Sequence, residues 1–270
     1  MVHPIERLRW VARAPEGEAS LVAAEAAEAL AAFADEPAGL VIACRRLIER
    51  RPACGPLWWL SARMLCALDP PLEAALIAAE LERDPTATAL AAELPGGAVA
   101  VAGWPELAAR ALRARGRGGA EVPADDTVYV AGSSREAHRL ARWFEMSDVD
   151  ARTASPEKAA KRAALVLLEA EALGPQGFVA GAGSEALALA ARAAGRPVWL
   201  VAGVARTLPG PLYDALLDRV TAAGRGVDSV EILPLDLVEA VAGPQGVVVP
   251  AAAAARPGCP VAPELLRFPG

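Results

Sequence analysis

From Gly96 onward, short apolar runs alternate with stretches of helical periodicity, and this alternation constrains the fold more than any other feature. The apolar runs cover residues 98–101, 127–130, 164–168, 198–201 and 230–233. Helical stretches follow the first three runs, at 105–115, 135–144 and 185–194. Uninterrupted apolar strands that alternate with helices of about 10–15 residues indicate βαβ units, whose parallel sheet is covered on both faces. We therefore expect an α/β domain over residues 95–270.

Parallel strands joined by helices obey a right-handed crossover rule, which predicts a doubly wound, Rossmann-like sandwich for this domain. Before it, the chain has only helical periodicity. Apolar residues recur at helical spacing from residue 21 to residue 81, and breaks at 35–39, Pro52, Pro70-Pro71 and Asp84-Pro85 separate the stretches. We expect an N-terminal helical domain over residues 1–94.

Composition excludes several classes of protein. The hydrophobic fraction is 54% and the charged fraction 22% over 270 residues, values typical of a folded globular chain. The net charge is −6, whereas nucleic-acid binding requires a basic surface. The densest basic run, Arg110 to Arg117, is interpreted as the end of a solvated helix. We expect no direct contact with nucleic acid.

Metal and membrane sites are equally unsupported by the sequence. The four cysteines, Cys44, Cys54, Cys66 and Cys259, lack CxxC spacing, and the chain has only two histidines, so no metal or cofactor is expected. Cys44 and Cys66 lie among apolar residues on predicted helices, where a buried thiol acts as a small hydrophobic group. No signal peptide or membrane span is predicted, which makes the cytoplasm the expected location.

Ligands of doubly wound sheets bind at the carboxyl ends of the strands, so the residues that follow each strand are the candidates. The turn with Gly181, Gly183 and Ser184 precedes a helix, whose N-terminal N–H groups attract anions. It lacks the third glycine of a dinucleotide-binding motif and the lysine of a P-loop. A tight turn with Ser184 as helix cap is the alternative.

A second candidate follows the strand at 127–130. Ser133, Ser134 and Arg135 offer two hydroxyls and a guanidinium that could bind a phosphate, and the alternative is a helix cap with a solvated arginine. Gly103 and Trp104 follow the first strand, and Glu171 follows the third as a candidate general base. His138, within a predicted helix, is interpreted as a surface residue.

Several segments resemble the family that joins the regulatory subunits of translation initiation factor 2B to sugar-phosphate isomerases, such as methylthioribose-1-phosphate and ribose-1,5-bisphosphate isomerase. They are residues 167–173 with the glycine-rich turn that follows, 195–202, 233–238 and 259–266. The resemblance spans roughly residues 40 to 268. It implies a helical domain, a Rossmann-like domain related to the NagB/RpiA/CoA-transferase fold, and a homodimer formed through the latter.

The departures from that family bear on activity. The resemblance places a catalytic cysteine after the first strand, where this chain has Gly103 or its neighbours, and it aligns the catalytic aspartate with Glu171. The Asn-Lys-Ile-Gly-Thr segment of the isomerases is reduced to Gly181-Ala182-Gly183-Ser184, and the Glu-Ser-Arg-Pro segment to Gly132-Ser133-Ser134-Arg135. A catalytic group misplaced by about 1 Å can cost on the order of 100-fold in rate, so isomerase activity is expected to be lost.

Three hypotheses follow. The first is a non-catalytic relative that binds a phosphorylated sugar or nucleotide, or that acts as a dimeric scaffold. The second is an aldose–ketose isomerase with a rearranged site around Glu171, and the third is a translation-associated interaction subunit. An enzyme would have a deep strand-end pocket, a scaffold would have that pocket filled by side chains such as Trp104, and an interaction subunit would expose an apolar patch.

Overall fold

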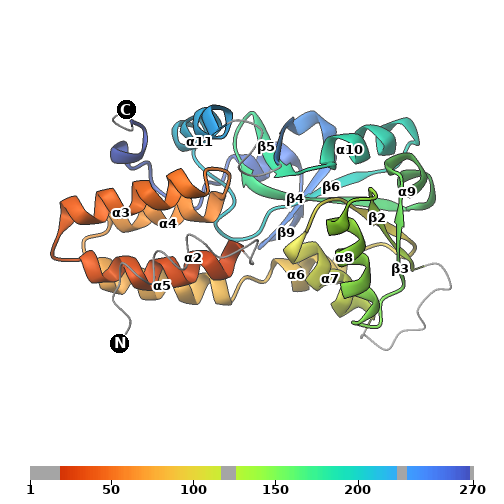
Figure 1. Ribbon diagram of the computed structural model, residues 1–270, viewed down its shortest axis with the longest axis horizontal. Helices are drawn as coiled ribbons and strands as arrows, with labels where there is room; N and C mark the ends of the chain where they lie inside the picture. The colour runs from red at the N-terminus through yellow and green to blue at the C-terminus, as the bar shows by residue number, and fades with distance from the viewer. Residues whose placement is uncertain (1–18, 117–125, 224–229, 268–270) are drawn as a thin grey trace.

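The computed structural model describes residues 19–116, 126–223 and 230–267, and it contains a helical domain beside an α/β domain (Figure 1). Proline at the first or second position begins three of the early helices, and the Asp69 carboxylate caps one of them through the Leu72 N–H at 3.1 Å. The helices of this first part are α2 (Ala19–Leu30), α3 (Pro37–Arg50), α4 (Gly55–Cys66), α5 (Pro70–Glu82) and α6 (Thr86–Glu93), with a 3₁₀ turn at Ala31–Phe33.

Helices α2 to α5 pack together, whereas α6 packs against the α/β domain. Its neighbours are the helix α7 (Glu106–Gly116) and the strands β8 (Ala240–Gly243) and β9 (Gly246–Val248). We therefore propose that the boundary between the domains lies near Asp84, before α6, about ten residues earlier than the sequence pattern predicts.

The central sheet has the strand order β3-β2-β1-β4-β6-β8-β9, and all neighbouring pairs are parallel except β8 with β9. This confirms the predicted doubly wound architecture. Its switch point lies between β1 and β4, where the strand order reverses. The other strands of this sheet are β1 (Val99–Val101), β2 (Val128–Ala131), β3 (Ala151–Ala154), β4 (Leu165–Leu173) and β6 (Val198–Val201).

A side hairpin departs from the predicted pattern. Strand β4 continues beyond the parallel sheet, and its second half pairs antiparallel with β5 (Gly177–Gly181), which in turn pairs antiparallel with β7 (Val230–Pro234). The apolar run at 230–233 is thus a strand, as predicted, but it does not join the parallel sheet. A three-residue connection between β4 and β5 permits only an antiparallel pair, since a parallel pair requires a long crossover.

Alternate strand residues point to opposite faces of the sheet and form two cores. Val99, Val101 and Leu167 pack with α7 and α8, whereas Ala100 and Val166 pack with the helices on the other face (Figure 1). The remaining helices are α8 (Arg135–Glu145), α9 (Pro156–Arg162), α10 (Ser184–Ala193), α11 (Gly210–Ala223) and α12 (Pro250–Ala254), with 3₁₀ turns at Leu235–Leu237 and Pro263–Leu265.

A third core joins the two domains. Trp58 and Trp59 of α4 are fully buried in it, and Ala172 and Val179 reach it from β4 and β5. The extension of β4 is therefore the element that carries Glu171 from the sheet to the helical domain. Cys44 is buried as predicted, but the prediction for Cys66 was wrong, because its thiol is exposed at the end of α4. No helix within the described ranges is long and apolar enough to cross a membrane.

Candidate functional site

Two of the predicted turns meet at the carboxyl end of the sheet. Gly103 follows β1 with a φ of 65°, a left-handed conformation that favours glycine, and Gly181 ends β5. A Cβ atom built on Gly103 would lie 3.6 Å from the Cα atom of Gly181. Such close backbone approach explains small residues at both positions. The segments predicted to form one strand-end site are therefore neighbours.

Glu171 lies at an irregularity in β4, where the pairing with β5 shifts between Ala170 and Ala172. The shift turns Glu171 toward the domain junction, and the first residue of α4, Gly55, packs directly on its backbone. A Cβ atom on Gly55 would stand 2.4 Å from the Glu171 carbonyl oxygen. The Glu171 side chain is 36% exposed and its Oε2 lies 3.2 Å from Nη1 of Arg206.

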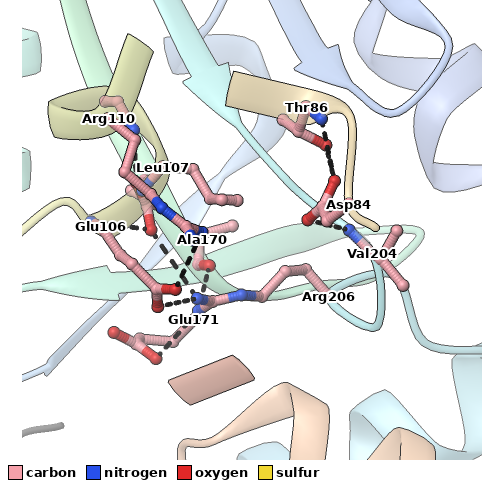
Figure 2. A network of polar contacts seen from close by, with 11 residues as sticks. Asp84, Thr86, Glu106, Leu107, Arg110, Ala170, Glu171, Val204 and Arg206 are labelled. Carbon is pink, nitrogen blue, oxygen red and sulfur yellow. Dashed lines mark hydrogen bonds and ion pairs between the residues drawn. The ribbon is translucent and has the colours of Figure 1, made fainter. Parts of the chain in front are cut away.

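Arg206 is the centre of a polar cluster that the sequence analysis did not anticipate. Its side chain is only 2% exposed, and Nη1 also donates to the Ala170 carbonyl at 2.9 Å. Nη2 lies 3.6 Å from the carboxylate of Glu106 and 3.7 Å from that of Glu169. Figure 2 shows Glu106 and Glu171 converging on the guanidinium. Three carboxyl groups thus surround one buried cation.

Glu169 also caps helix α7. Its Oε1 accepts from the Glu106 N–H at 3.0 Å, and its Oε2 accepts from the N–H groups of Leu107 and Ala108 at 2.8 and 3.0 Å. Burial raises the pKa of Glu169 to about 8, although the charge of Arg206 and the bond from Ala108 act in the opposite direction. A carboxyl group therefore occupies the N-terminus of the helix that follows β1.

The predicted anion site before α10 is likewise filled from within the chain. Gly183, with a φ of 85°, and Glu185 donate their N–H groups to the carboxylate of Glu231 on β7, at 2.9 and 2.7 Å. Ser184 is buried as the first residue of α10, and Gly183 occupies the N-cap position that was predicted for Ser184. Glu231 thus holds the place in which an external anion was predicted to bind at Gly181–Ser184.

For the residues after β2, the sequence left open a phosphate site or a helix cap, and the structure places these residues in different surroundings. Ser134 caps α8, because its Oγ accepts from the Ala137 N–H at 3.1 Å. Ser133 and Arg135 instead line an open hollow of about 560 Å³. The hollow is completed by further residues of α8 and of the turn after it, which are His138, Arg139, Arg142 and Met146.

Trp104 packs on α8 and does not fill the space beside Glu171, contrary to what was expected of a scaffold. Its ring centroid is 6.4 Å from that of Trp143, and the Arg139 guanidinium lies 4.9 Å from the Trp104 ring. The space is filled by Glu106, Glu169 and Arg206. The sequence signal for Glu169 was available, since it stands two residues before Glu171 on one strand. Nothing in the local pattern marked Glu106 or Arg206.

A thiol nucleophile is also missing from the strand ends that the structure describes. Cys54, just before α4, lies within electrostatic reach of Glu171 and Arg206, but burial raises its pKa to about 11. Such a thiol stays protonated at neutral pH. Within the described ranges, no group of three or more His, Cys, Asp or Glu side chains is arranged to hold a metal ion.

No protein-family model matches the chain, and no curated protein matches its sequence. Solved structures do match. A translation initiation factor eIF-2B from Pyrococcus horikoshii OT3 is 16% identical with a TM-score of 0.74, covering 93% of this chain and 98% of its own.

Two further structures give the same result. The tetrameric eIF2B-beta2-delta2 complex from C. thermophilum contains a chain that is 15% identical, with a TM-score of 0.71 and coverage of 93% and 92%. The 5-methylthioribose 1-phosphate isomerase from Pyrococcus horikoshii OT3 is 17% identical, with a TM-score of 0.63 and coverage of 92% and 85%. The suspected resemblance is confirmed, and at these identities it establishes the fold alone.

Proposed function

We propose that this protein is a non-catalytic relative of the initiation-factor-2B and isomerase fold that binds a phosphorylated small molecule. The observation that carries the proposal is the contrast between two groups of cations at the strand ends. Arg206 is buried and surrounded by three carboxyl groups of the chain itself. The cations of the α8 hollow, lined by Ser133, Arg135, His138, Arg139, Arg142 and Met146, face an open space with no carboxylate in its lining.

The Glu171 site lacks the parts that an aldose–ketose isomerisation needs. That reaction requires groups that move protons between carbon and oxygen while they stay within hydrogen-bond reach of the substrate. One oxygen of Glu171 is bonded to Arg206, and Glu169 is tied to three backbone N–H groups. Cys54 is protonated. Glu171 is 36% exposed, whereas the carboxyl groups of Glu106 and Glu169 that share Arg206 with it are buried.

The α8 hollow suits phosphate oxygens. In the described part of the chain, neither Arg135 nor Arg142 forms an ion pair, so both guanidinium forks are available to a ligand. Nδ1 of His138 lies 2.8 Å from the Ser134 carbonyl and must donate to it, which leaves Nε2 for other partners. Arginine at the first turn of a helix is unfavourable in itself, because it opposes the helix dipole. A bound anion would remove that penalty.

A phosphate-binding scaffold of this kind is expected to be a homodimer formed through the α/β domain. The support is the edge strand β7, which pairs only with β5 among the described strands and exposes 47% of Ile232. Leu189 of α10, the helix that β7 contacts, is 50% exposed. Two apolar side chains beside an open strand edge are suited to pairing with a second copy.

An interaction subunit is the second candidate, and a specific surface favours it. Leu72 and Leu76 of α5 and Leu68, two residues before the helix, recur at intervals of four residues, with exposures of 57%, 49% and 105%. Exposed leucines in such a row are uncommon on monomeric proteins and indicate a covered surface. This candidate would leave the α8 hollow without a ligand.

The deciding experiment is a thermal-shift screen of the purified protein against ribose 5-phosphate, fructose 1,6-bisphosphate and adenosine monophosphate. A ligand at about 100 times its Kd should stabilise the native state by about 2.7 kcal/mol. We expect Arg135→Ala to abolish the shift and Arg46→Ala, an exposed arginine of α3, to leave it unchanged. No shift with any ligand, or a shift that Arg135→Ala retains, would contradict the proposal. Turnover that Glu171→Gln abolishes would establish the isomerase alternative.

A further inference from the structure

A seam joins α4 to the C-terminal segment, and two of the four cysteines lie on it. On α4, the residues Trp59, Arg63 and Cys66 are spaced by four and three positions and so share one helix face. Nε1 of Trp59 donates to the Gly258 carbonyl at 2.8 Å. At the other end, Sγ of Cys66 lies 4.0 Å from the Val261 carbonyl. The segment Gly258–Val261 therefore runs along this face of α4.

The segment bends at Gly258 and Cys259, between its contacts with Trp59 and Cys66. Cys259 lies between the two contacts, only two residues from the carbonyl that Cys66 touches.

The two thiols are within electrostatic reach of each other and differ in exposure. Burial raises the pKa of Cys259, the Arg63 charge lowers it, and a charge on Cys66 raises it. Cys66 is exposed and Cys259 is half-buried, whereas Cys44 and Cys54 are both buried. All four are free thiols. In many thiol pairs that form a reversible disulfide, an exposed cysteine reacts first and a neighbouring cysteine then resolves the adduct. Cys66 and Cys259 differ in exposure in this way.

We propose that Cys66 and Cys259 form a reversible disulfide that locks the C-terminal segment onto the helical domain. The oxidant is a low-molecular-weight disulfide such as oxidised glutathione. The Cys66 thiolate attacks one sulfur of that disulfide, forms a mixed disulfide and releases one glutathione thiolate. The Cys259 thiolate then attacks the Cys66 sulfur, and the second glutathione thiolate leaves. Both cysteines are oxidised, and the two cysteine protons pass through solvent to the two released glutathione thiolates, which gives two molecules of glutathione.

The disulfide would hold a C-terminal segment that makes other contacts with the helical domain. Arg45 of α3 donates three hydrogen bonds to the carbonyls of Glu264 and Arg267, so the segment is also held farther along. At its beginning, Gly258 and Trp59 line a cavity of about 240 Å³ at the carboxyl ends of β6 and β8. Oxidation would thus fix the wall of this cavity, and reduction would free it.

The test uses the full-length protein incubated with oxidised glutathione at pH 8.5, because burial raises the pKa of both thiols and slows exchange at neutral pH. We expect a loss of about 2 Da per chain, a cross-linked Cys66–Cys259 peptide, and complete reversal by dithiothreitol. Hydrogen exchange at residues 258–262 should slow by about tenfold or more in the oxidised form. Cys66→Ser and Cys259→Ser should each abolish the 2 Da loss, and Cys54→Ser should leave it intact.

Three other outcomes would each overturn the proposal. A stable glutathione adduct on Cys66 in the unmodified sequence would mean that Cys259 does not reach it. Dimers linked through Cys66 on a non-reducing gel would mean that the exposed thiol pairs between molecules. A cross-linked peptide that forms without any slowing of exchange at 258–262 would mean that the disulfide does not lock the segment. Cys66→Ala serves as a second variant, so that reduced folding of one substitution does not decide the result.

Discussion

Replacing Glu169 by glutamine should change how stability depends on pH. Burial raises the pKa of this carboxyl group to about 8 in the folded protein, whereas its ordinary value is 4.5. Between these values the native state holds a proton that the unfolded state has released. Stability conferred by the group is therefore complete below pH 4.5 and falls as the pH rises toward 8.

The magnitude follows from the protonation difference. One proton bound by the native state and not by the unfolded state makes the free energy of unfolding fall by up to about 1.4 kcal/mol per pH unit. Glutamine cannot titrate, so the Glu169→Gln variant loses this slope. Its amide also places N–H groups against the N-terminus of α7, at a cost of about 1–3 kcal/mol that does not vary with pH. The pH-dependent part of the stability difference thus reports the protonation of Glu169, and the pH-independent part reports the change in hydrogen bonding at the N-terminus of α7.

Urea denaturation at intervals of one unit from pH 5 to pH 8 measures both. The variant should have a lower unfolding free energy than the parent at pH 5. By pH 8 the difference between the two should have shifted by a few kcal/mol in favour of the variant, so that it becomes smaller or changes sign. Glu49→Gln, the same change at an exposed position of α3, should give a difference that is flat across the range. If the difference for Glu169→Gln is also flat within about 0.5 kcal/mol, the carboxyl group does not hold a proton near neutrality and the reasoning fails.

Further predictions concern the cluster and the helix ends. Arg206→Met leaves buried carboxylates without their cation and should lower the unfolding free energy by about 3–5 kcal/mol in urea denaturation at pH 7, and a loss below about 1 kcal/mol would refute the role of the ion pairs. Ser134→Ala should cost about 1 kcal/mol in the same assay as a lost helix cap, while Ser133→Ala should be nearly neutral, and equal losses would contradict the capping assignment. Gly55→Ala forces a Cβ atom to 2.4 Å from a strand carbonyl and should destabilise by about 1–3 kcal/mol, measured by thermal melting. Glu231→Ala should cost about 1 kcal/mol at the N-terminus of α10, and the loss should shrink in 1 M salt if the helix dipole contributes.

The parallel sheet could be predicted from the sequence because its signal is local. A strand buried on both faces must be apolar at every position, and the run at 198–201 matches the observed strand Val198–Val201 residue for residue. Strands β3, β5, β8 and β9 were missed. β3 is only partly buried and contains Arg152, and β9 is only half-buried throughout. β5 and β8 are short and rich in glycine and alanine, so neither forms a distinct run of large apolar residues. The exposure of Cys66 was missed for a related reason, because helical periodicity does not show where the last turn leaves the core.

The position of the candidate site could be predicted from the sequence, but the residues that interact with one another there could not. Strand ends named from the sequence do lie together, since Gly103 touches Gly181 and Glu171 stands at the domain junction. The partners of these residues come from far along the chain. Arg206 meets Glu171 across 35 positions, and Glu231 meets Gly183 across 48. Such pairs depend on strand register and on the path of the side hairpin, which no local pattern encodes.

The internal carboxylates explain how this edge differs from a phosphate site. The N-terminus of a helix carries unpaired N–H groups and a positive dipole end, so some anion is stabilising there whether it comes from a ligand or from the chain. Glu169 fills this position on α7 and Glu231 fills it on α10. A ligand phosphate would have to displace a side-chain carboxyl group that is already hydrogen-bonded and, for Glu169, buried. Among the described residues, Arg135 and Arg142 form no ion pair and lie outside the cluster, in the α8 hollow, where an external anion would not have to displace a carboxyl group.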